Sequence, residues 1–272
     1  RNENPDAIIA QIVAGLPADT QHILIEPDRA QAILHAVMSA DPADIVLIAG
    51  KGHETYQEVA GRRQVFDDRQ WARAAMLLLQ GRPLQSDSRK ITSGAVFLAL
   101  RGDKFDGHDY LAQVSAAGAC AAIVDHAVSG EPITQLVLGD TRAALLQLGL
   151  AWRRRFAIPL IAVTGSNGKT TTKEMIAAIL AAWQGEDGRL ATAGNLNNEL
   201  GVPLTLLRLT AAHKVAVIEM GMNHPGQIAV LAHAARPTVA LVNNAQREHQ
   251  EFMATVEAVA RENAQVWRAL SV

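Results

Sequence analysis

The chain has 272 residues, of which 49% are hydrophobic and 19% charged, and its formal net charge at pH 7 is −2. This length and composition suit a globular α/β protein of roughly two or three domains, and the small net charge argues against a nucleic-acid-binding surface. The single cysteine, Cys120, excludes an intrachain disulfide and is expected to be a small buried residue. No apolar run of about 18 residues and no signal-peptide pattern occurs, so we expect a cytoplasmic protein without membrane insertion.

Residues 1–80 form the first of three predicted α/β blocks. Their spacing predicts helices over 6–14 and 29–39, and apolar runs predict strands over 22–26 and 44–49. The second strand runs into a loop that begins at Gly50 and contains Glu54. A buried strand that ends in a glycine-rich loop is a usual place for a ligand. A dinucleotide cofactor is disfavoured, because the third glycine of its fingerprint is missing and no clear helix follows.

The second block, residues 81–157, begins at a Gly-Arg-Pro joint. Strands are predicted over 95–100, 121–124 and 135–138, and helices from about residue 110 and over 141–154. The polar residues of this block are concentrated in two loops, 86–89 and 101–108.

The third block, residues 158–272, contains the most informative motif of the chain. An apolar strand over 160–163 leads into a tight loop, and a helix follows to about residue 184. Glycines allow backbone N–H groups to approach a ligand, a lysine adds positive charge, a threonine hydroxyl suits hydrated Mg²⁺, and the helix dipole favours an anion. The motif therefore predicts a site for nucleotide phosphates, made by Thr164, Gly165, Ser166, Asn167, Gly168, Lys169, Thr170 and Thr171. A strict P-loop would have glycine in place of Val163. A plain strand–turn–helix corner is the alternative, but Gly-Lys-Thr-Thr-Thr at a helix start is costly without an anion.

Three continuous apolar runs in this block, 160–163, 215–218 and 239–242, predict parallel strands whose carboxyl ends share one edge of a sheet. Glu219 follows the second run and is either placed to hold Mg²⁺ opposite the phosphate loop or an ordinary solvated glutamate at a strand end. His249 follows the third and is either a metal ligand, a phosphate contact or a structural residue. Asn195 and Asn198 lie in an amide-rich loop that suits a phosphate or peptide ligand, or else caps the following helix.

These motifs resemble the Mur ligase family. Residues 164–175, 194–207 and 219–228 are similar to the central domain of its MurF-type members, and residues 87–90 and 101–108 to the N-terminal domain of the same members. Residues 1–5, 28–30, 48–57 and 66–69 resemble the C-terminal domain of MurE-type members. The order of these parts indicates a piece of a MurE–MurF fusion, with domains 1–80, 81–157 and an incomplete 158–272.

The resemblance implies an ATP-dependent ligase of peptidoglycan-precursor synthesis. MurF-type members add D-Ala-D-Ala to UDP-N-acetylmuramoyl-tripeptide through an acyl phosphate, and MurE-type members add diaminopimelate or lysine to the shorter muramoyl peptide. The implied catalytic residues are Lys169, Glu219 and His249, and the implied Mg²⁺ ligands are Thr170, Glu219 and His249. The implied substrate contacts are Ser88, Arg89, Asp106 and His108 for the UDP-sugar, Asn195 and Asn198 for phosphates or peptide, and Arg1, Gly50 and Glu54 for diaminopimelate. Arg1 favours diaminopimelate over lysine.

Some features depart from the family pattern. Asn263 stands where family members usually carry a lysine, often carbamylated, which affects how a second metal would be bound. The segment before Asp87 is shortened, and the chain ends inside the central domain. We therefore expect weak nucleotide binding and no complete ligation from this chain alone. The alternative is a non-catalytic module of Mur-like fold that binds a UDP-sugar, a nucleotide or a partner ligase. A folylpolyglutamate synthase is disfavoured by the UDP-sugar signature of the second block. The sequence leaves the oligomeric state open.

Overall fold

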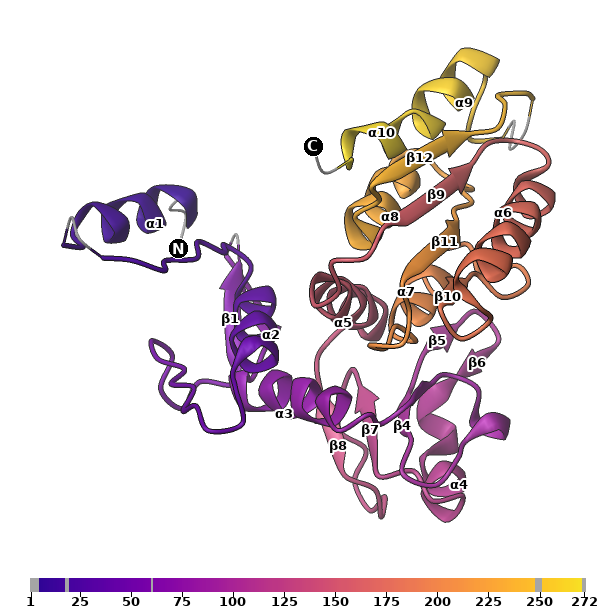
Figure 1. Cartoon of the computed structure of the whole chain (residues 1–272). Coiled ribbons are helices and arrows are strands. Elements are labelled where there is room, and N and C mark those ends of the chain that lie inside the picture. Colours follow the sequence, from indigo (N-terminus) through magenta and orange to yellow (C-terminus); the bar gives the residue numbers. More distant parts are fainter. Residues whose placement is uncertain (1–4, 18–19, 60, 248–250, 271–272) are drawn as a thin grey trace. The chain divides into compact units, whose positions relative to one another are not determined.

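The computed structural model describes residues 5–17, 20–59, 61–247 and 251–270 (Figure 1). The chain divides into two compact units, residues 1–141 and 142–272, which we call unit 1 and unit 2. This division joins the first predicted block to most of the second, while the three-domain boundaries stay a prediction. Among the described residues, no helix is both long and apolar enough to cross a membrane.

Unit 1 begins with three helices and a hairpin. These are α1 (Pro5–Ala14), α2 (Arg29–Ser39), β1 (Tyr56–Val59) paired antiparallel with β2 (Arg62–Val65), and α3 (Asp68–Leu79). The Asp28 and Asp67 carboxylates cap α2 and α3 by accepting hydrogen bonds from free backbone N–H groups. The two helices pack against each other and bury Leu34 and Trp71.

The strands predicted over 22–26 and 44–49 do not form, which corrects the sequence-based expectation. Both runs are irregular and exposed: Leu24 is 60% exposed and Ile45 95%. An apolar run becomes a strand only where a neighbouring strand accepts its hydrogen bonds and a face covers its side chains. The described part of the chain provides neither for these two runs.

The rest of unit 1 is a parallel sheet in the order β3-β4-β7-β8. Its strands are β3 (Leu84–Gln85), β4 (Val96–Leu98), β7 (Ala121–Val124) and β8 (Gln135–Val137), so the three strands predicted here are confirmed with slightly different ends. The 101–108 loop contains a small hairpin of β5 (Arg101–Gly102) and β6 (Phe105–Asp106). Two 3₁₀ turns, η1 (Ser88–Lys90) and η2 (Gly107–Tyr110), and α4 (Leu111–Ala116) complete the unit. Cys120 is exposed, contrary to expectation, because it lies in the turn before β7.

Unit 2 is built on a parallel sheet in the order β10-β11-β9-β12. Its strands are β9 (Leu160–Thr164), β10 (Arg189–Ala191), β11 (Val215–Glu219) and β12 (Val239–Val242). Its helices are α5 (Thr141–Arg154), α6 (Lys169–Gln184), α7 (Gly201–Leu206), α8 (Gln227–Ala235), α9 (Val256–Asn263) and α10 (Gln265–Arg268). The three predicted parallel strands are therefore confirmed, with the phosphate-loop strand β9 between β11 and β12.

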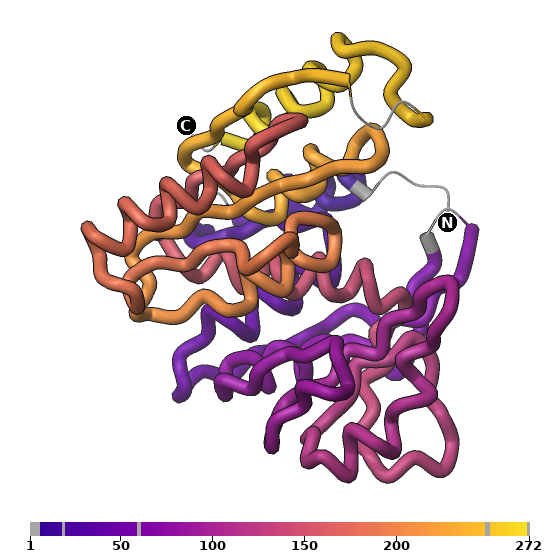
Figure 2. The backbone as a smooth tube through the Cα atoms, turned by 90° about the vertical axis from the view of Figure 1, so that its right-hand side faces the viewer, coloured from indigo at the N-terminus to yellow at the C-terminus, as the bar shows by residue number. Residues whose placement is uncertain are grey.

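The side chains of the central strands point alternately to the two faces of this sheet, and they are buried on both. Leu160 and Ile218 belong to a core shared with α7 and α8, whereas Val163 and Val217 pack with α6. Figure 2 shows the backbone from the side on which α6 lies. Because the central strands β9 and β11 are covered on both faces, we expect ligands at the carboxyl ends of the strands.

Candidate nucleotide site

The phosphate loop joins the end of β9 to the start of α6. Gly165 has a φ of +128°, and Gly168, the N-cap of α6, has a φ of +75°. A Cβ atom at position 165 would lie 2.9 Å from the backbone oxygen of Asn244. Only glycine fits this closely packed backbone, and the turn leaves the first N–H groups of α6 free for an anion.

The loop after β12 holds the phosphate loop in place. The Asn244 side chain accepts a hydrogen bond from the Asn167 N–H at 3.0 Å and donates one to the Asn167 carbonyl at 3.0 Å. Asn243 donates to the same carbonyl at 2.6 Å, and Ser166 N–H donates to the Asn244 carbonyl at 3.1 Å. Asn243 and Asn244 directly follow the third predicted strand, but no role was predicted for them from the sequence. The structure makes them the clamp that preorganises the loop.

Lys169, the first residue of α6, turns back over the loop. Its ammonium donates hydrogen bonds to the carbonyls of Gly165 and Ser166, the latter at 3.0 Å. These partners are neutral, so a phosphate entering the loop would be a stronger partner for this charge.

Glu219, at the end of β11, lies beside the start of α6. Its Oε1 accepts hydrogen bonds from Thr170 Oγ1 at 3.2 Å and Asn197 Nδ2 at 2.8 Å. The side chain is 1% exposed, and among the described residues its Oε2 has no hydrogen-bond partner. A buried carboxylate oxygen without a partner is costly, and a bound cation would offset that cost. Thr170 and Glu219 are oxygen ligands of the kind Mg²⁺ prefers, so the residues present fit this ion.

A cavity of about 230 Å³ adjoins these residues. Asn195 and Asn198 line it, as does Lys169. The Asn198 side chain also accepts hydrogen bonds from Leu200 N–H at 3.2 Å and Gly201 N–H at 2.9 Å, so it caps α7 as the alternative interpretation expected. Asn197 is the residue that sequence reasoning missed, although it stands between two asparagines that were singled out.

Asn263, where the resemblance leads us to expect a lysine, takes part in a buried hydrogen bond. Thr164 Oγ1, at the start of the phosphate loop, donates to Asn263 Oδ1 at 2.6 Å, and Asn263 Nδ2 donates to the Val259 carbonyl at 3.0 Å. Both side chains are 1% exposed. Through these hydrogen bonds, Asn263 therefore links α9 to the end of β9.

Comparison with known proteins identifies this arrangement. Residues 163–271 match the Mur ligase middle domain, and residues 83–148 match the Mur ligase family, catalytic domain. The two matched segments belong to the Mur ligase family.

Similar proteins include the UDP-N-acetylmuramoyl-tripeptide–D-alanyl-D-alanine ligase of Synechocystis, which is 45% identical over 177 residues, covering 64% of this chain and 38% of the relative. The crystal structure of MurF from Acinetobacter baumannii matches with a TM-score of 0.65 and 43% identity, over 70% of this chain and 41% of that chain. MurF ligase from Thermotoga maritima in complex with ADP gives a TM-score of 0.64 and 31% identity, over 72% and 44%. The chain thus spans about two fifths of the length of these relatives.

Unit 1 contains a second cavity, of about 420 Å³, between η1 and η2. Asp87, Ser88 and Arg89 line it. The hydrogen bond from the Arg89 side chain lowers the pKa of Asp87 from 3.8 to about 2. Asp106 and His108 are not among its lining residues. They pair with each other, Nδ1 to Oδ1 at 2.6 Å, next to the cavity wall formed by Phe105 and Gly107.

The remaining predicted residues lie in the first block or outside the described chain. Gly50 has a φ of +105°, and Glu54 is exposed. Arg29 holds this loop against α3, because its side chain donates to the Ala49 carbonyl at 3.0 Å and pairs with Asp68 at 2.6 Å. Arg1 and His249 lie outside the described residues.

Proposed function

We propose that this chain is the nucleotide-binding part of a MurF-type ligase, a cytoplasmic enzyme that adds D-Ala-D-Ala to UDP-N-acetylmuramoyl-tripeptide. The observation that carries the proposal is the buried Glu219 carboxylate beside the phosphate loop. Thr170 and Asn197 donate to one of its oxygens, and the other has no hydrogen-bond partner within the described part of the chain. It is supported by the names of the similar ligases.

The proposed reaction has two steps. The terminal carboxylate of the tripeptide attacks the γ-phosphorus of ATP, which gives an acyl phosphate and ADP. The amine of D-Ala-D-Ala then attacks the acyl carbon, a tetrahedral intermediate forms, and phosphate leaves as the amide is made. Lys169 and the loop N–H groups would neutralise charge on the transferring phosphoryl group. Mg²⁺, held by Thr170 and Glu219 with His249 as a further proposed ligand, would supply additional charge neutralisation.

For the muramoyl substrate, we propose the unit 1 cavity. Ser88 and Arg89 line it, and a guanidinium beside hydroxyl groups suits a diphosphate. Asp106 and His108 would shape its wall rather than contact the sugar directly. Asn195 and Asn198 would face the nucleotide phosphates or the peptide from the unit 2 cavity.

For residues 1–80, we propose the C-terminal part of a MurE-type ligase, which makes the chain part of a MurE–MurF fusion with domains 1–80, 81–157 and 158–272. This proposal rests on the motifs at 1–5 and 48–57, with Arg1, Gly50 and Glu54 as contacts for diaminopimelate. The support of the 49–52 loop by Arg29 is consistent with a ligand loop.

Replacement of Glu219 by Gln tests the nucleotide site. Removing the charge takes away the metal ligand, so we expect Mg·ADP to bind at least about tenfold more weakly, while stability is unchanged or higher because an incompletely paired buried charge is removed. Isothermal titration of the full chain and urea unfolding measure the two effects.

Lys169→Ala should weaken binding of the nucleotide with or without Mg²⁺, whereas Glu186→Gln, at an exposed side chain paired with Arg189, should change neither binding nor stability appreciably. Nucleotide binding that is equally strong in all three variants would refute the proposed site. Binding of UDP-muramoyl-tripeptide without any nucleotide binding would instead favour a non-catalytic module.

A further inference from the structure

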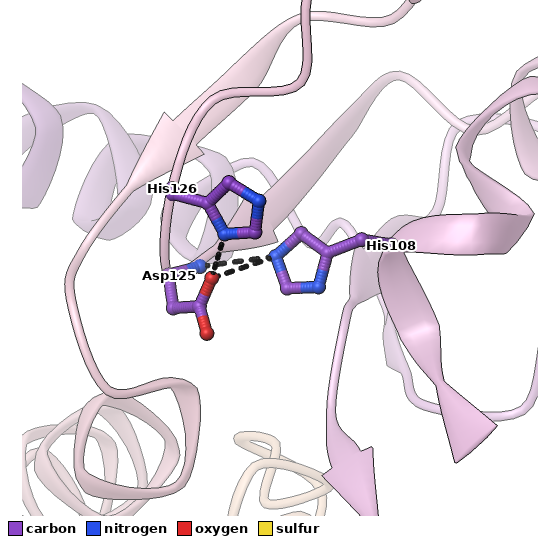
Figure 3. Close-up of side chains that lie close together, drawn as sticks. All are labelled: His108, Asp125 and His126. Atoms are coloured by element: carbon purple, nitrogen blue, oxygen red, sulfur yellow. Dashed lines mark hydrogen bonds and ion pairs between the residues drawn. The ribbon is translucent and has the colours of Figure 1, made fainter.

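A second group of ligating side chains lies in unit 1, whereas the phosphate loop belongs to unit 2. It consists of His108 from η2 and Asp125 and His126, which follow β7 (Figure 3). The three nearest ligand atoms, His108 Nε2, Asp125 Oδ1 and His126 Nδ1, lie within 4.8 Å of one another. We call these residues the His–Asp–His cluster.

The tautomer of His108 is set by Asp106. Asp106 Oδ1 lies 2.6 Å from His108 Nδ1, and because a carboxylate only accepts, Nδ1 carries the proton. In the neutral ring, Nε2 then presents its lone pair toward Asp125, whose backbone N–H donates to it at 3.3 Å. The His108 side chain is only 5% exposed, so this orientation is held by the surrounding protein.

The cluster brings three ligand atoms together. Asp125 Oδ1 lies 3.1 Å from His108 Nε2 and also contacts His126 Nδ1. Because a carboxylate only accepts, His126 Nδ1 carries the proton that bridges it to Asp125 Oδ1. Arg101 lies 3.3 Å from His126 Nδ1 and pairs with Asp125 Oδ2 at 3.2 Å. A metal ion binds deprotonated ligands, so a divalent cation would take the place of that proton and accept the lone pair of His108 Nε2.

We propose that the His–Asp–His cluster binds a divalent transition-metal ion of the Zn²⁺ class. Two imidazole nitrogens and one carboxylate oxygen form a ligand set of the type found in zinc sites with three protein ligands and a water. Asp106 on His108 Nδ1 and Arg101 on Asp125 Oδ2 are the outer hydrogen-bond partners that such ligands have.

Binding requires one local rearrangement. The His108 and His126 rings are stacked, with centroids 4.6 Å apart and an angle of 22°, so their in-plane lone pairs do not converge on one point. His126 is 53% exposed and can turn, whereas buried His108 stays fixed. The ion would tie η2 to the end of β7 and so stiffen the wall of the unit 1 cavity at Phe105 and Gly107.

Titration of the tag-free full chain with Co²⁺ tests this site. In the Glu219→Gln background, which removes the proposed Mg²⁺ ligand, we expect one equivalent of Co²⁺ to produce a visible absorption band that Zn²⁺ abolishes. His126→Ala and Asp125→Asn should lose this band. Asp106→Asn should weaken Co²⁺ binding by roughly 10–100-fold, as second-shell changes do.

His233→Ala removes an exposed histidine of α8 and should leave the band unchanged. The proposal would be overturned if the band were absent in the parent protein or equally strong in His126→Ala and Asp125→Asn. The cluster would then be a group of side chains linked by hydrogen bonds without a metal. Circular dichroism of each variant shows that it is folded. The result does not depend on nucleotide binding, so Lys169→Ala should behave as the parent protein does.

Discussion

At the scale of single residues, the side chains around the phosphate loop act through their neighbours. Thr164 and Asn263 come from opposite ends of unit 2 in the sequence, yet their side chains share a buried hydrogen bond of 2.6 Å. A lysine in place of Asn263 would present a charge at this position, whereas the amide accepts from Thr164 and donates to Val259. In this chain, the Asn263 side chain therefore helps to hold the phosphate loop in place.

We expect substitutions of Thr164 and Asn263 to be strongly coupled in their effects on the free energy of unfolding. Asn263→Leu leaves the Thr164 hydroxyl buried without an acceptor and should lower the free energy of unfolding by about 1–3 kcal/mol. The double variant Thr164→Val, Asn263→Leu removes both partners and should recover part of that loss. A double-mutant cycle from urea unfolding measures the coupling, which we expect to be about 0.5–3 kcal/mol. Additive losses would show that the hydrogen bond contributes little.

The pair of Asp87 and Arg89 predicts a pH effect. Because the pKa of Asp87 falls to about 2 in the folded protein, the carboxylate stabilises the folded state above its ordinary value of 3.8, and this contribution is lost as the pH falls through about 2. Arg89→Ala should return the pKa toward 3.8. Carbon-13 NMR titration of aspartate carboxyls measures it, with Arg268→Ala as the control. An Asp87 pKa near 3.8 in the unmodified protein would contradict the pairing.

At the scale of elements, the phosphate loop is a closely packed turn that the loop after β12 keeps in place. Two glycines with positive φ allow the cost of the backbone conformation to be distinguished from the cost of steric crowding. Gly185, after α6, has a φ of +79° and nothing within 4 Å of a built Cβ, whereas Gly165 has backbone atoms of Asn243 and Asn244 within 3.0 Å.

Gly185→Ala should therefore cost about 1–3 kcal/mol through its backbone conformation alone, because φ +79° with ψ 163° is a region that essentially only glycine adopts. Gly165→Ala adds a backbone clash, so we expect a loss of at least about 3 kcal/mol together with loss of Mg·ADP binding. Thermal and urea unfolding compare the two variants. Equal losses would mean that the loop after β12 yields easily and does not clamp the phosphate loop.

At the scale of the whole molecule, the chain combines well-packed sheets with two exposed apolar segments. In unit 2 the central strands are buried on both faces, while residues 23–25 and 45–47 of unit 1 are exposed and outside any sheet.

Hydrogen exchange should reveal this contrast. Amides at 23–25 and 45–47 should exchange almost unprotected, and those of β9 and β11 should be the slowest. Mg·ADP at about 100 times its Kd stabilises a binding unit by about 2.7 kcal/mol, so exchange through global opening should slow about 100-fold in unit 2. Mass spectrometry of peptides measures both effects. Strong protection at 45–47 would contradict the exposed conformation, and equal slowing in unit 1 would show that nucleotide binding stabilises both units.

Most elements could be predicted from local patterns, because the period of the apolar residues reports what each segment buries. The strands β9, β11 and β12 were predictable for this reason, as were the helices α5 and α6. The same reasoning failed at 22–26 and 44–49, where the apolar runs are present but the partner strands and covering face are not. The prediction that Cys120 is buried failed similarly, because its apolar neighbours in the sequence do not show that it lies in a turn.

The sequence by itself determined the phosphate loop, the parallel sheet that carries it and the resemblance to the Mur ligases, because glycine spacing, helix-start chemistry and apolar runs are local properties. Only the tertiary structure decided which side chains meet. It brought Asn197 and Thr170 to Glu219, closed Asn243 and Asn244 over the loop and joined Asn263 to Thr164. These contacts join residues far apart in the chain, and their positions depend on strand order and crossovers that local patterns do not encode.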